Sequence, residues 1–408
     1  MVRDTSVPIV ILQSVPSLQH GGLGIARTAG RLGVQVYWIY GRNRTPATLS
    51  RYVRGTFYWD TRTPVEASVA YLQECSRKIE GSKPILIPVD DAATIFVADQ
   101  ADALREYFLF PNQPAGLART LSSKKEMYFL CKKTGVPTPE AAFPQSLADV
   151  ATFAETAVFP VVIKLIAGWV PEHRPQLKSV TIVNSTKELL EEYARNETPD
   201  QPNVMLQEYI PGGPEDVWMF NGCFTDSSEC LIGLTGKKIR QAPPFTGATT
   251  LGICLQNETV EKMTRDLMQG IGYSGIVDMG YRYDRRDGQY KLLDVNPRVG
   301  ATFRLFVDSN GMDVVQALYL NLTGQPLPPG RAREGRKWIV EQSDLVTSLR
   351  YGRLGRLTVT EWARSLRGIE EAAWFAKDDP LPFAAMCWAS LVKGGRIARA
   401  KVQKARVV

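Results

Sequence analysis

The stretch that decides the fold is GIVDMGYRYDRRDGQYKLLDVNPR, residues 275–298. Two largely apolar runs flank the turn signature at 284–288, so we expect a hairpin of two antiparallel strands. Asp278 and Asp294 lie inside these runs, where an ionised carboxylate is costly unless a cation satisfies it. Asn296 follows Asp294 by two residues, so both side chains point to one face of the strand. Two carboxylates and an amide oxygen are hard oxygen ligands, and they predict a Mg²⁺ site.

Arg298 extends this row if the strand continues past Pro297, because it follows Asn296 by two residues. A guanidinium there can hold a carboxylate or an acyl phosphate through two parallel hydrogen bonds. Buried ion pairs within the sheet are the alternative explanation of the same cluster.

Two upstream segments add groups suited to a nucleotide. FPVVIK, residues 159–164, predicts a strand with Lys164 at its end, where an ammonium can meet phosphate oxygens. QEYIPGGPE, residues 207–215, predicts a strand that runs into a Gly/Pro hinge between Glu208 and Glu215. Such a hinge can present backbone groups to a purine edge, and a carboxylate beyond it can bind ribose hydroxyls. A solvated strand-end lysine and a polar turn are the alternatives.

The N-terminal residues predict a small α/β domain. An apolar run at 7–12, a helical pattern at 23–32 and a second apolar run at 34–40 form a βαβ opening, and a third strand is expected at 84–89. The glycines of HGGLG, residues 20–24, do not match G-x-G-x-x-G. At a strand–helix turn they could offer amides to an anion, or they could simply permit the turn.

Together these segments resemble the ATP-grasp superfamily, specifically its carboxylate–amine ligases of the D-aspartate ligase-like and carbamoyl phosphate synthase-like kind. FPVVIK, QEYIPG and LDVNPR carry the resemblance, which covers roughly residues 1–325, and segment 236–250 adds to it. The implied fold is α/β and α+β. Its expected parts are a Rossmann-like domain at 1–115, an ATP-grasp domain at 116–330 (small lobe about 120–210, large lobe about 211–330) and a C-terminal helical extension at 331–408.

The resemblance implies ATP contacts at matching positions. Lys124 or Lys125, together with Lys164, would contact the phosphates. Glu208 would accept from the adenine amino group, and the Tyr209–Ile210 backbone would hold the base. Glu215 would bind the ribose, with Asp216 as a competitor for that role.

The resemblance also implies the groups that carry the chemistry. Asp278, Asp294 and Asn296 would hold Mg²⁺, although the superfamily more often has Glu at the place of Asp294. Arg298 would stabilise the acyl phosphate and the tetrahedral intermediate. Lys238 and Arg240 would lie near the γ-phosphate or the acceptor carboxylate, and a basic surface strand is the alternative for this pair.

The implied function is ATP-dependent formation of an amide bond through an acyl phosphate, with ATP and Mg²⁺ as cofactors. The substrates would be a small carboxylate and an amine, one of them an amino acid. The loop at 167–178 could close over the phosphates through Arg174 and Lys178. A non-catalytic ATP-binding scaffold is the main alternative, and the missing G-x-G-x-x-G disfavours a nicotinamide-dependent oxidoreductase.

The composition fits chemistry without histidine. The chain has 408 residues, a formal net charge of +7 and only two histidines, His20 and His173. A histidine-rich metal cluster is excluded, and few candidates remain for a Ser-His-Asp or Cys-His nucleophile. The six cysteines form no C-x-x-C pair, which favours buried thiols in a reducing compartment.

The two ends of the chain give weaker signals. The first residues lack the apolar core of a signal peptide, and no run approaches about 20 apolar residues, so we expect a cytoplasmic protein without a transmembrane segment. The basic stretch at 393–408 is expected to be a solvated tail rather than a nucleic-acid site. Trp362, Trp374, Phe375 and Trp388 are expected to be packing residues. The C-terminal segment could cover the clamp, line the acceptor site or form a homodimer contact.

Overall fold

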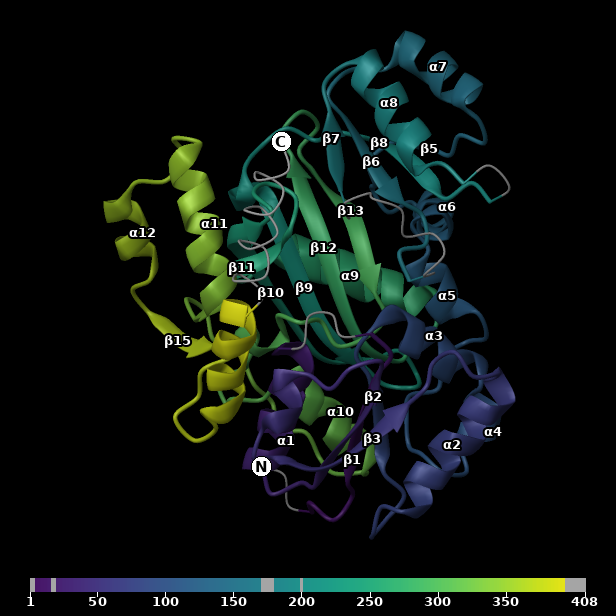
Figure 1. Ribbon diagram of the computed structural model, residues 1–408, viewed down its shortest axis with the longest axis vertical. Helices are drawn as coiled ribbons and strands as arrows, with labels where there is room; N and C mark the ends of the chain where they lie inside the picture. Colours follow the sequence, from purple (N-terminus) through teal and green to yellow (C-terminus); the bar gives the residue numbers. More distant parts are fainter. Residues whose placement is uncertain (1–3, 16–19, 170–179, 199–200, 393–408) are drawn as a thin grey trace, which may run out of the picture.

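The computed structural model describes residues 4–15, 20–169, 180–198 and 201–392, whose strands form three sheets (Figure 1). The mixed α/β and α+β architecture expected from the sequence is confirmed. In Figure 1 an N-terminal domain lies at the bottom, a large sheet occupies the centre, and a small lobe lies at the upper right. The C-terminal segment covers the left side of the large sheet.

The N-terminal domain is a parallel four-stranded sheet in the order β3-β2-β1-β4. β3 was not expected, because VRGTFYW mixes an arginine and a glycine with aromatic residues and pairs only with β2 at the sheet edge. The elements are β1 (Ile9–Gln13), α1 (His20–Arg31), β2 (Val36–Gly41), β3 (Val53–Trp59), α2 (Val65–Arg77), β4 (Ile85–Pro88), α3 (Asp91–Asp99) and α4 (Ala101–Leu104).

The glycines near position 20 lie inside α1, so the expected strand–helix turn at this place is wrong. A Cβ on Gly22 would lie 2.4 Å from the Trp38 ring, and one on Gly24 would lie 2.7 Å from the Phe303 ring. Both contacts are far shorter than van der Waals distance. The glycines therefore let α1 pack closely against β2 on one side and against the region around residue 303 on the other.

The small lobe is an antiparallel sheet in the order β5-β8-β6-β7 with α7 and α8 packed together on it (Figure 1). Two helices lead into it, and Ser123 caps the second by accepting from the Glu126 amide, as expected for a serine before this helix. The elements are α5 (Leu117–Ser122), α6 (Lys124–Thr134), β5 (Ala141–Ala142), α7 (Leu147–Thr156), β6 (Val161–Leu165), β7 (Thr181–Val183), α8 (Thr186–Asn196) and β8 (Val204–Glu208).

The large lobe is built on a seven-stranded sheet in the order β13-β12-β9-β10-β11-β14-β15. The hairpin expected at 275–298 is confirmed as β12 and β13, which pair antiparallel. The elements are β9 (Val217–Phe224), β10 (Cys230–Ala242), β11 (Ala248–Cys254), α9 (Glu258–Gly270), β12 (Gly275–Asp284), β13 (Gln289–Asn296) and α10 (Val314–Leu322), with short 3₁₀ turns at Pro214–Asp216 and Phe303–Leu305. A further 3₁₀ turn, Pro46–Leu49, lies between β2 and β3 of the N-terminal domain.

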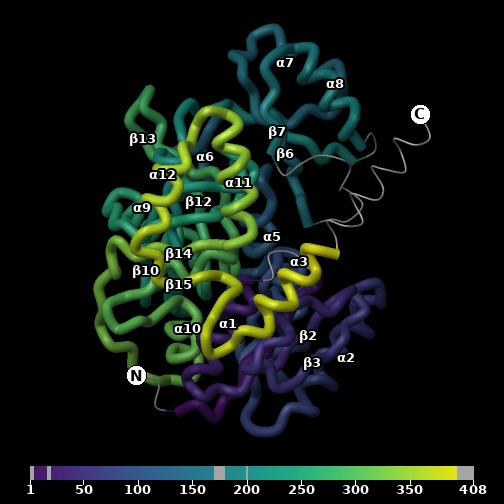
Figure 2. Tube along the Cα trace, turned by 60° about the vertical axis from the view of Figure 1, so that its left-hand side comes forward, coloured from purple at the N-terminus to yellow at the C-terminus, as the bar shows by residue number. Residues whose placement is uncertain are grey.

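The segment after residue 330 is not only helical, which corrects the expectation of a helical extension. Its strands β14 (Lys337–Ile339) and β15 (Ile369–Ala372) join the large sheet beside β11. Its helices are α11 (Glu341–Arg353), α12 (Val359–Ser365) and a helix whose described residues are 381–392. Figure 2 shows α11 and α12 lying over the β14–β15 side of the sheet. The Trp388 side chain of the helix at 381–392 is 71% exposed, so it is not the packing residue expected from the sequence.

No helix among the described residues is long and apolar enough to cross a membrane.

Candidate functional site

The β12–β13 hairpin places Asp278, Asp294 and Asn296, here called the acidic row, on one face of the sheet. Asp278 pairs with Asn296 across the hairpin, and Asp294 pairs with Gly280, so these four positions share a face. The Asn296 amide nitrogen lies 3.4 Å from Asp278 Oδ2 and 3.5 Å from Asp294 Oδ2. Gly280 adds no side chain to this face, and a Cβ built there would meet only the Asp294 Cβ, at 4.0 Å.

The two carboxylates have opposite electrostatic surroundings. Burial raises the pKa of Asp278, whose side chain accepts a hydrogen bond from Asn221 at 3.2 Å. Burial also acts to raise the pKa of Asp294, but Lys124, Lys164 and Arg298 together outweigh it and lower this pKa overall. Lys124 Nζ lies 2.5 Å from Asp294 Oδ1. Asp278 therefore lacks a direct cationic partner among the described residues, and a cation placed between the pair would supply one.

Lys164 adds a second ammonium beside this row. It lies in β6 with only 8% of its surface exposed and donates to Gln207 Oε1 at 2.7 Å. Burial and the nearby Lys124 lower its pKa to about 8. The start of α6 is tied to the end of β6, because the Lys124 N–H donates to the Ile166 carbonyl at 3.1 Å.

The geometry separates Lys124 from Lys125, which the sequence left as alternatives. Lys124 points to Asp294, whereas Lys125 Nζ lies 5.8 Å from the centre of the Phe143 ring. Lys124 is therefore the member of the pair that faces the acidic row.

Lys238 and Arg240 diverge, because a β-bulge lies between them in β10. Lys238 Nζ donates to the Gly247 carbonyl at 3.0 Å; burial lowers its pKa, while Asp278 and Asp294 act in the opposite direction. Arg240 instead forms a two-bond ion pair with Asp344 of α11, with both distances 2.8 Å. The Arg240 and Asp344 side chains are 4% and 1% exposed. The expected catalytic role does not fit Arg240, because its guanidinium is enclosed by the C-terminal segment.

Arg298 links the acidic row to the N-terminal domain. Its Nε lies 2.6 Å from Asp91 Oδ1 at the start of α3, and its Nη2 donates to Asn296 Oδ1 at 3.1 Å. A polar cavity beside it is lined by Gly21, Asp90, Asp91, Trp169 and Ala301. The guanidinium is thus fixed where a substrate anion between the N-terminal domain and the large lobe would meet it.

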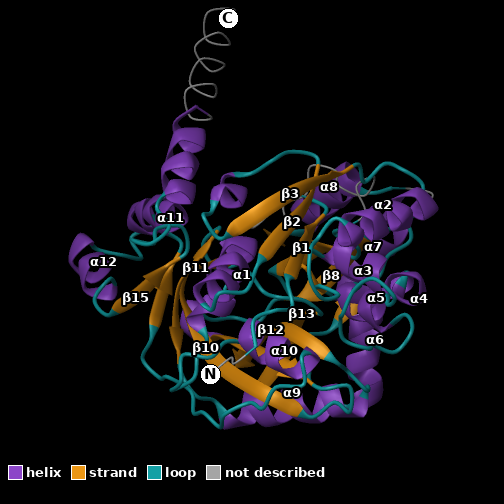
Figure 3. Ribbon diagram, turned by 90° about the horizontal axis from the view of Figure 1, so that it is seen from below, coloured by secondary structure: helices purple, strands orange, loops and turns teal. Residues whose placement is uncertain are grey.

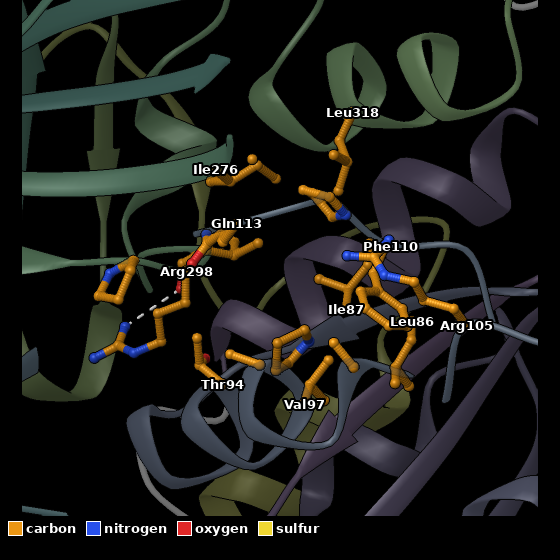
Figure 4. Close-up of a pocket in the computed structure, with 17 residues that line it drawn as sticks. Leu86, Ile87, Thr94, Val97, Arg105, Phe110, Gln113, Ile276, Arg298 and Leu318 are labelled. Atoms are coloured by element: carbon orange, nitrogen blue, oxygen red, sulfur yellow. Dashed lines mark hydrogen bonds between the residues drawn. The ribbon is translucent and has the colours of Figure 1, made fainter. Parts of the chain in front are cut away.

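A second, apolar cavity lies on the other side of Arg298. Figure 4 shows Ile87, Val97, Phe110, Ile276 and Leu318 gathered around it, with the Arg298 guanidinium directed away from them. The boundary between the two domains is thus apolar here and polar on the side of Asp91.

The hinge at 208–216 carries the groups expected around adenine and ribose. Glu208 is paired with Arg286 at 2.5 Å and also accepts from the Glu140 amide at 3.2 Å. Ile210 is buried, and among the described residues neither its N–H nor its C=O has a hydrogen-bond partner. The Ile210 N–H and C=O could therefore both bond to a base, whereas the Glu208 carboxylate is already bound by Arg286 and the Glu140 amide.

The two candidate ribose ligands, Asp216 and Glu215, differ in burial and in hydrogen-bond partners. Asp216 is buried, pairs with Arg285 at 2.8 Å and accepts from the Gly213 amide. Glu215 is exposed and has no hydrogen-bonded partner among the described residues. Glu215 is the better placed of the two to receive a ligand.

The sequence missed several groups that shape the site. Asn221, Gln207, Asp91 and Asp344 each contact a predicted residue. Asn221 had a signal, because it is a lone amide within the apolar strand VWMFNGCF. The other three are identified only by the fold. Arg174 and Lys178 of the expected phosphate loop lie outside the described residues.

The residues fit a hard divalent cation, although no group of three or more His, Cys, Asp or Glu side chains suited to a metal occurs in the part of the chain that is described. The third ligand would be an amide oxygen. The Asn296 oxygen now faces Arg298 and its nitrogen faces the carboxylates, so the amide would rotate to bind a cation. The buried Asn221 Oδ1 has no hydrogen-bond partner in the described part of the chain and adds a further oxygen beside Asp278.

The three sheets and their strand order match the ATP-grasp fold, the fold that the sequence resemblance implied. Solved structures agree: an L-amino acid ligase from Bacillus licheniformis matches with a TM-score of 0.58 at 19% identity, covering 78% of this chain and 74% of that one. The ADP complex of purK, an N5-carboxyaminoimidazole ribonucleotide synthetase, matches with a TM-score of 0.61 at 12% identity, covering 82% of each chain.

The amino-acid sequence is also similar to curated proteins. D-Aspartate ligase of Enterococcus faecium is 22% identical over 251 residues, which are 58% of this chain and 58% of the relative. The C-terminal section of the carbamoyl phosphate synthase large chain of Methanopyrus kandleri is 22% identical over 207 residues, 49% of this chain and 36% of the relative. The chain thus aligns with less than two thirds of each of these relatives. No protein-family profile matches the chain.

Proposed function

We propose that this protein is an ADP-forming carboxylate–amine ligase that activates a carboxylate with ATP and joins it to an amine, with an amino acid as one substrate. One observation carries the proposal. The acidic row of Asp278, Asp294 and Asn296 lies beside three lysines from separate elements, Lys124, Lys164 and Lys238, with Arg298 at its end. This combination can neutralise a polyphosphate and hold a divalent cation.

The two lobes supply different parts of the ATP site. Lys124 and Lys164 would bind phosphate oxygens, and the Ile210 backbone, Glu208 and Glu215 would hold the base and the ribose. Asp278, Asp294 and Asn296 would hold Mg²⁺, which when bound neutralises charge on the transferring phosphoryl group. Phosphate binding would also favour the ammonium form of Lys164, whose pKa is lowered to about 8 by burial and by Lys124.

The proposed reaction has two steps. A substrate carboxylate oxygen attacks the γ-phosphorus of ATP, the bond to the β-phosphate oxygen breaks, and ADP leaves. The amine nitrogen then attacks the acyl carbon, loses a proton, and phosphate departs with the former carboxylate oxygen. Arg298 would stabilise the acyl phosphate, since its guanidinium is oriented by Asp91 and Asn296. Positioning and charge neutralisation carry both steps, and no histidine is required.

The partners and the location follow as parts of the same proposal. We propose small-molecule carboxylate and amine substrates and no nucleic-acid partner. A homodimer and a cytoplasmic location stay predictions.

The test combines turnover with a matched pair of variants. Purified protein would be incubated with ATP, Mg²⁺ and a panel of amino acids, while phosphate release is followed and amide products are sought by mass spectrometry. Asp294→Ala should lower turnover at least about 100-fold, because it removes a carboxylate of the phosphoryl-transfer site. Asp266→Ala should leave turnover unchanged, because Asp266 is an exposed residue of α9 that forms an ion pair with Lys262 on the same helix.

Two outcomes would contradict the proposal. An Asp294→Ala protein with wild-type turnover would remove the metal assignment. ATP binding by calorimetry without turnover for any substrate pair would support the non-catalytic scaffold instead.

A further inference from the structure

The apolar cavity beside Arg298, here called the boundary cavity, has walls from two domains. β4, α3 and α4 form the wall on the N-terminal domain, and β12, residues 297–299 and α10 form the wall on the large lobe. Figure 3 shows α3 and α4 to one side of β12 and α10. The cavity offers about 70 Å³ to the centres of water molecules, several times the roughly 10–15 Å³ that one water needs.

The lining of the boundary cavity is mainly aliphatic and aromatic. Its largest apolar side chains are each at most 8% exposed, and they are Ile87, Val97, Phe110, Ile276, Val299 and Leu318. Water finds few hydrogen-bond partners in such surroundings, so the space favours an apolar occupant of small size.

Arg105 adds a positive charge to this apolar lining. Its guanidinium carbon lies 4.8 Å from the centre of the Phe110 ring, and both residues line the cavity. Arg105 Nη2 donates to the Asn112 side-chain oxygen at 2.6 Å, and no carboxylate pairs with Arg105 among the described residues. An arginine has several further N–H donors in a planar fork that matches a carboxylate. The guanidinium can therefore receive an anion at the cavity.

The boundary cavity is separate from the acidic row. None of Asp278, Asp294 and Asn296 is among the residues that line it. Figure 4 shows Arg298 and Arg105 on opposite sides of the cavity, with the Arg298 guanidinium directed away from it. A molecule in the cavity would touch α3 and residues 297–299 together, and thus both domains, without reaching the predicted metal ligands.

We propose that the boundary cavity binds a small apolar monocarboxylate, which bridges the N-terminal domain and the large lobe at a site separate from the ATP site. The apolar body fills the cavity, and its burial supplies most of the binding. The carboxylate pairs with Arg105 and gives the site its preference for an anionic head group. Binding at this site does not rest on the proposed ligase chemistry.

Other ligand classes fit the cavity less well. A neutral hydrocarbon would leave the free donors of Arg105 unused, and an organic cation would be repelled by the guanidinium. A nucleotide needs several cationic groups for its phosphates, whereas the charged residues that line this cavity are Arg105 and Arg298. A monocarboxylate with an apolar body uses both the lining and the single available charge.

The first test compares three probes of equal chain length by calorimetry on the full chain. Hexanoate should bind with a dissociation constant of about 1 mM, as expected for a ligand of this size. Hexan-1-ol should bind at least about tenfold more weakly, and hexylammonium more weakly still, because neither pairs with a guanidinium. Saturating hexanoate should also raise the thermal midpoint of unfolding, since it binds only the folded boundary.

Two variants with matched controls assign the site. Ala98→Leu fills the cavity and should weaken hexanoate at least about tenfold, whereas Ala103→Leu, at an exposed position of α4 outside the lining, should not. Arg105→Gln should weaken hexanoate about tenfold and leave hexan-1-ol unchanged. Its control is Arg77→Gln, because the Arg77 guanidinium lies 4.8 Å from the Tyr107 ring in the same domain but does not line the cavity.

The proposal is overturned if the wild-type chain binds hexanoate no more tightly than hexan-1-ol, or if Arg105→Gln binds hexanoate as tightly as the wild type. Asp294→Ala should bind hexanoate like the wild type. Binding that is lost in Asp294→Ala but kept in Ala98→Leu would place the probe at the acidic row and refute a separate site. These measurements need no ATP, so a protein without ligase activity would still pass or fail them.

Discussion

Replacing one member of the buried Arg240–Asp344 pair should destabilise the protein strongly, whereas replacing both should not. Arg240 donates from Nε and Nη2 to the two Asp344 oxygens, and Asp344 also accepts from Thr250 Oγ1 at 3.0 Å. Both side chains are almost completely enclosed. Asp344→Leu would leave a buried guanidinium with one hydroxyl partner, Ser365.

The expected magnitude follows from the cost of an uncompensated buried charge. Breaking such a pair from one side typically costs about 3–5 kcal/mol, whereas exchanging both partners for apolar residues is close to neutral. We therefore expect Asp344→Leu to lose about 3–5 kcal/mol of unfolding free energy. Arg240→Met/Asp344→Leu should lie within about 1 kcal/mol of the wild type.

The assay is urea unfolding monitored by tryptophan fluorescence, together with turnover measured where each variant is folded. Trp338 and Trp374 report on this part of the protein, because both are buried. If Arg240 is structural, the double variant should keep turnover within about tenfold of the wild type. A double variant that is stable but has lost turnover at least about 1000-fold would refute the structural assignment and return Arg240 to the catalytic groups.

Three further predictions follow from single sites. Under the proposed function, Lys164→Met should raise the KM for ATP at least about tenfold at pH 7, because it removes an ammonium that would contact a phosphate. Steady-state kinetics measures this change, and an unchanged KM would limit Lys164 to a packing role. Burial lowers the pKa of His20 to about 4, below its unfolded value near 6.5. The free energy of unfolding should therefore keep its full value above about pH 6.5 and fall as the pH drops toward 4. Unfolding of His20→Gln measured against pH should lose this part of the pH dependence, and an unchanged pH dependence would contradict the argument. Gly22→Ala should lower the free energy of unfolding by about 1–3 kcal/mol, because its Cβ would clash with the Trp38 ring. Gly270→Ala is the control and should not destabilise the protein, because a Cβ there has no atom within 4 Å. Equal thermal midpoints for the two variants would contradict this reasoning.

The central strands were predictable because their apolar runs are continuous or interrupted by informative charges. The 275–298 hairpin carries both its turn signal and its two aspartates in sequence. β3 and β14 were not predictable in the same way. β3 is half exposed and contains Arg54 and Gly55, and β14 has only three residues, so neither has the apolar periodicity of a buried strand.

The residues of the candidate site could be predicted from the sequence, but the contacts between them could not. Residue type and spacing indicated Lys164, Asp278, Asp294 and Asn296. The choice between Lys124 and Lys125 depended on how α6 meets β6, which spacing alone does not specify. For Arg240 the spacing was misleading. Arg240 follows Lys238 by two residues and should point to the same face of the strand, but the bulge in β10 changes the alternation of side chains.

The C-terminal segment connects these observations. β14 covers the edge of β11, Asp344 of α11 satisfies Arg240, and Tyr351 of α11 accepts from the Phe245 amide in the loop that also holds Gly247. Gly247 in turn accepts from Lys238, which faces the acidic row. Because Lys238 and Arg240 belong to one strand and are held by neighbouring contacts, α11 supports the strand that carries Lys238 beside the acidic row. Residues 331–392 therefore act as part of the large lobe, and a chain ending near 330 would expose the edge of β11 and leave Arg240 without its carboxylate partner.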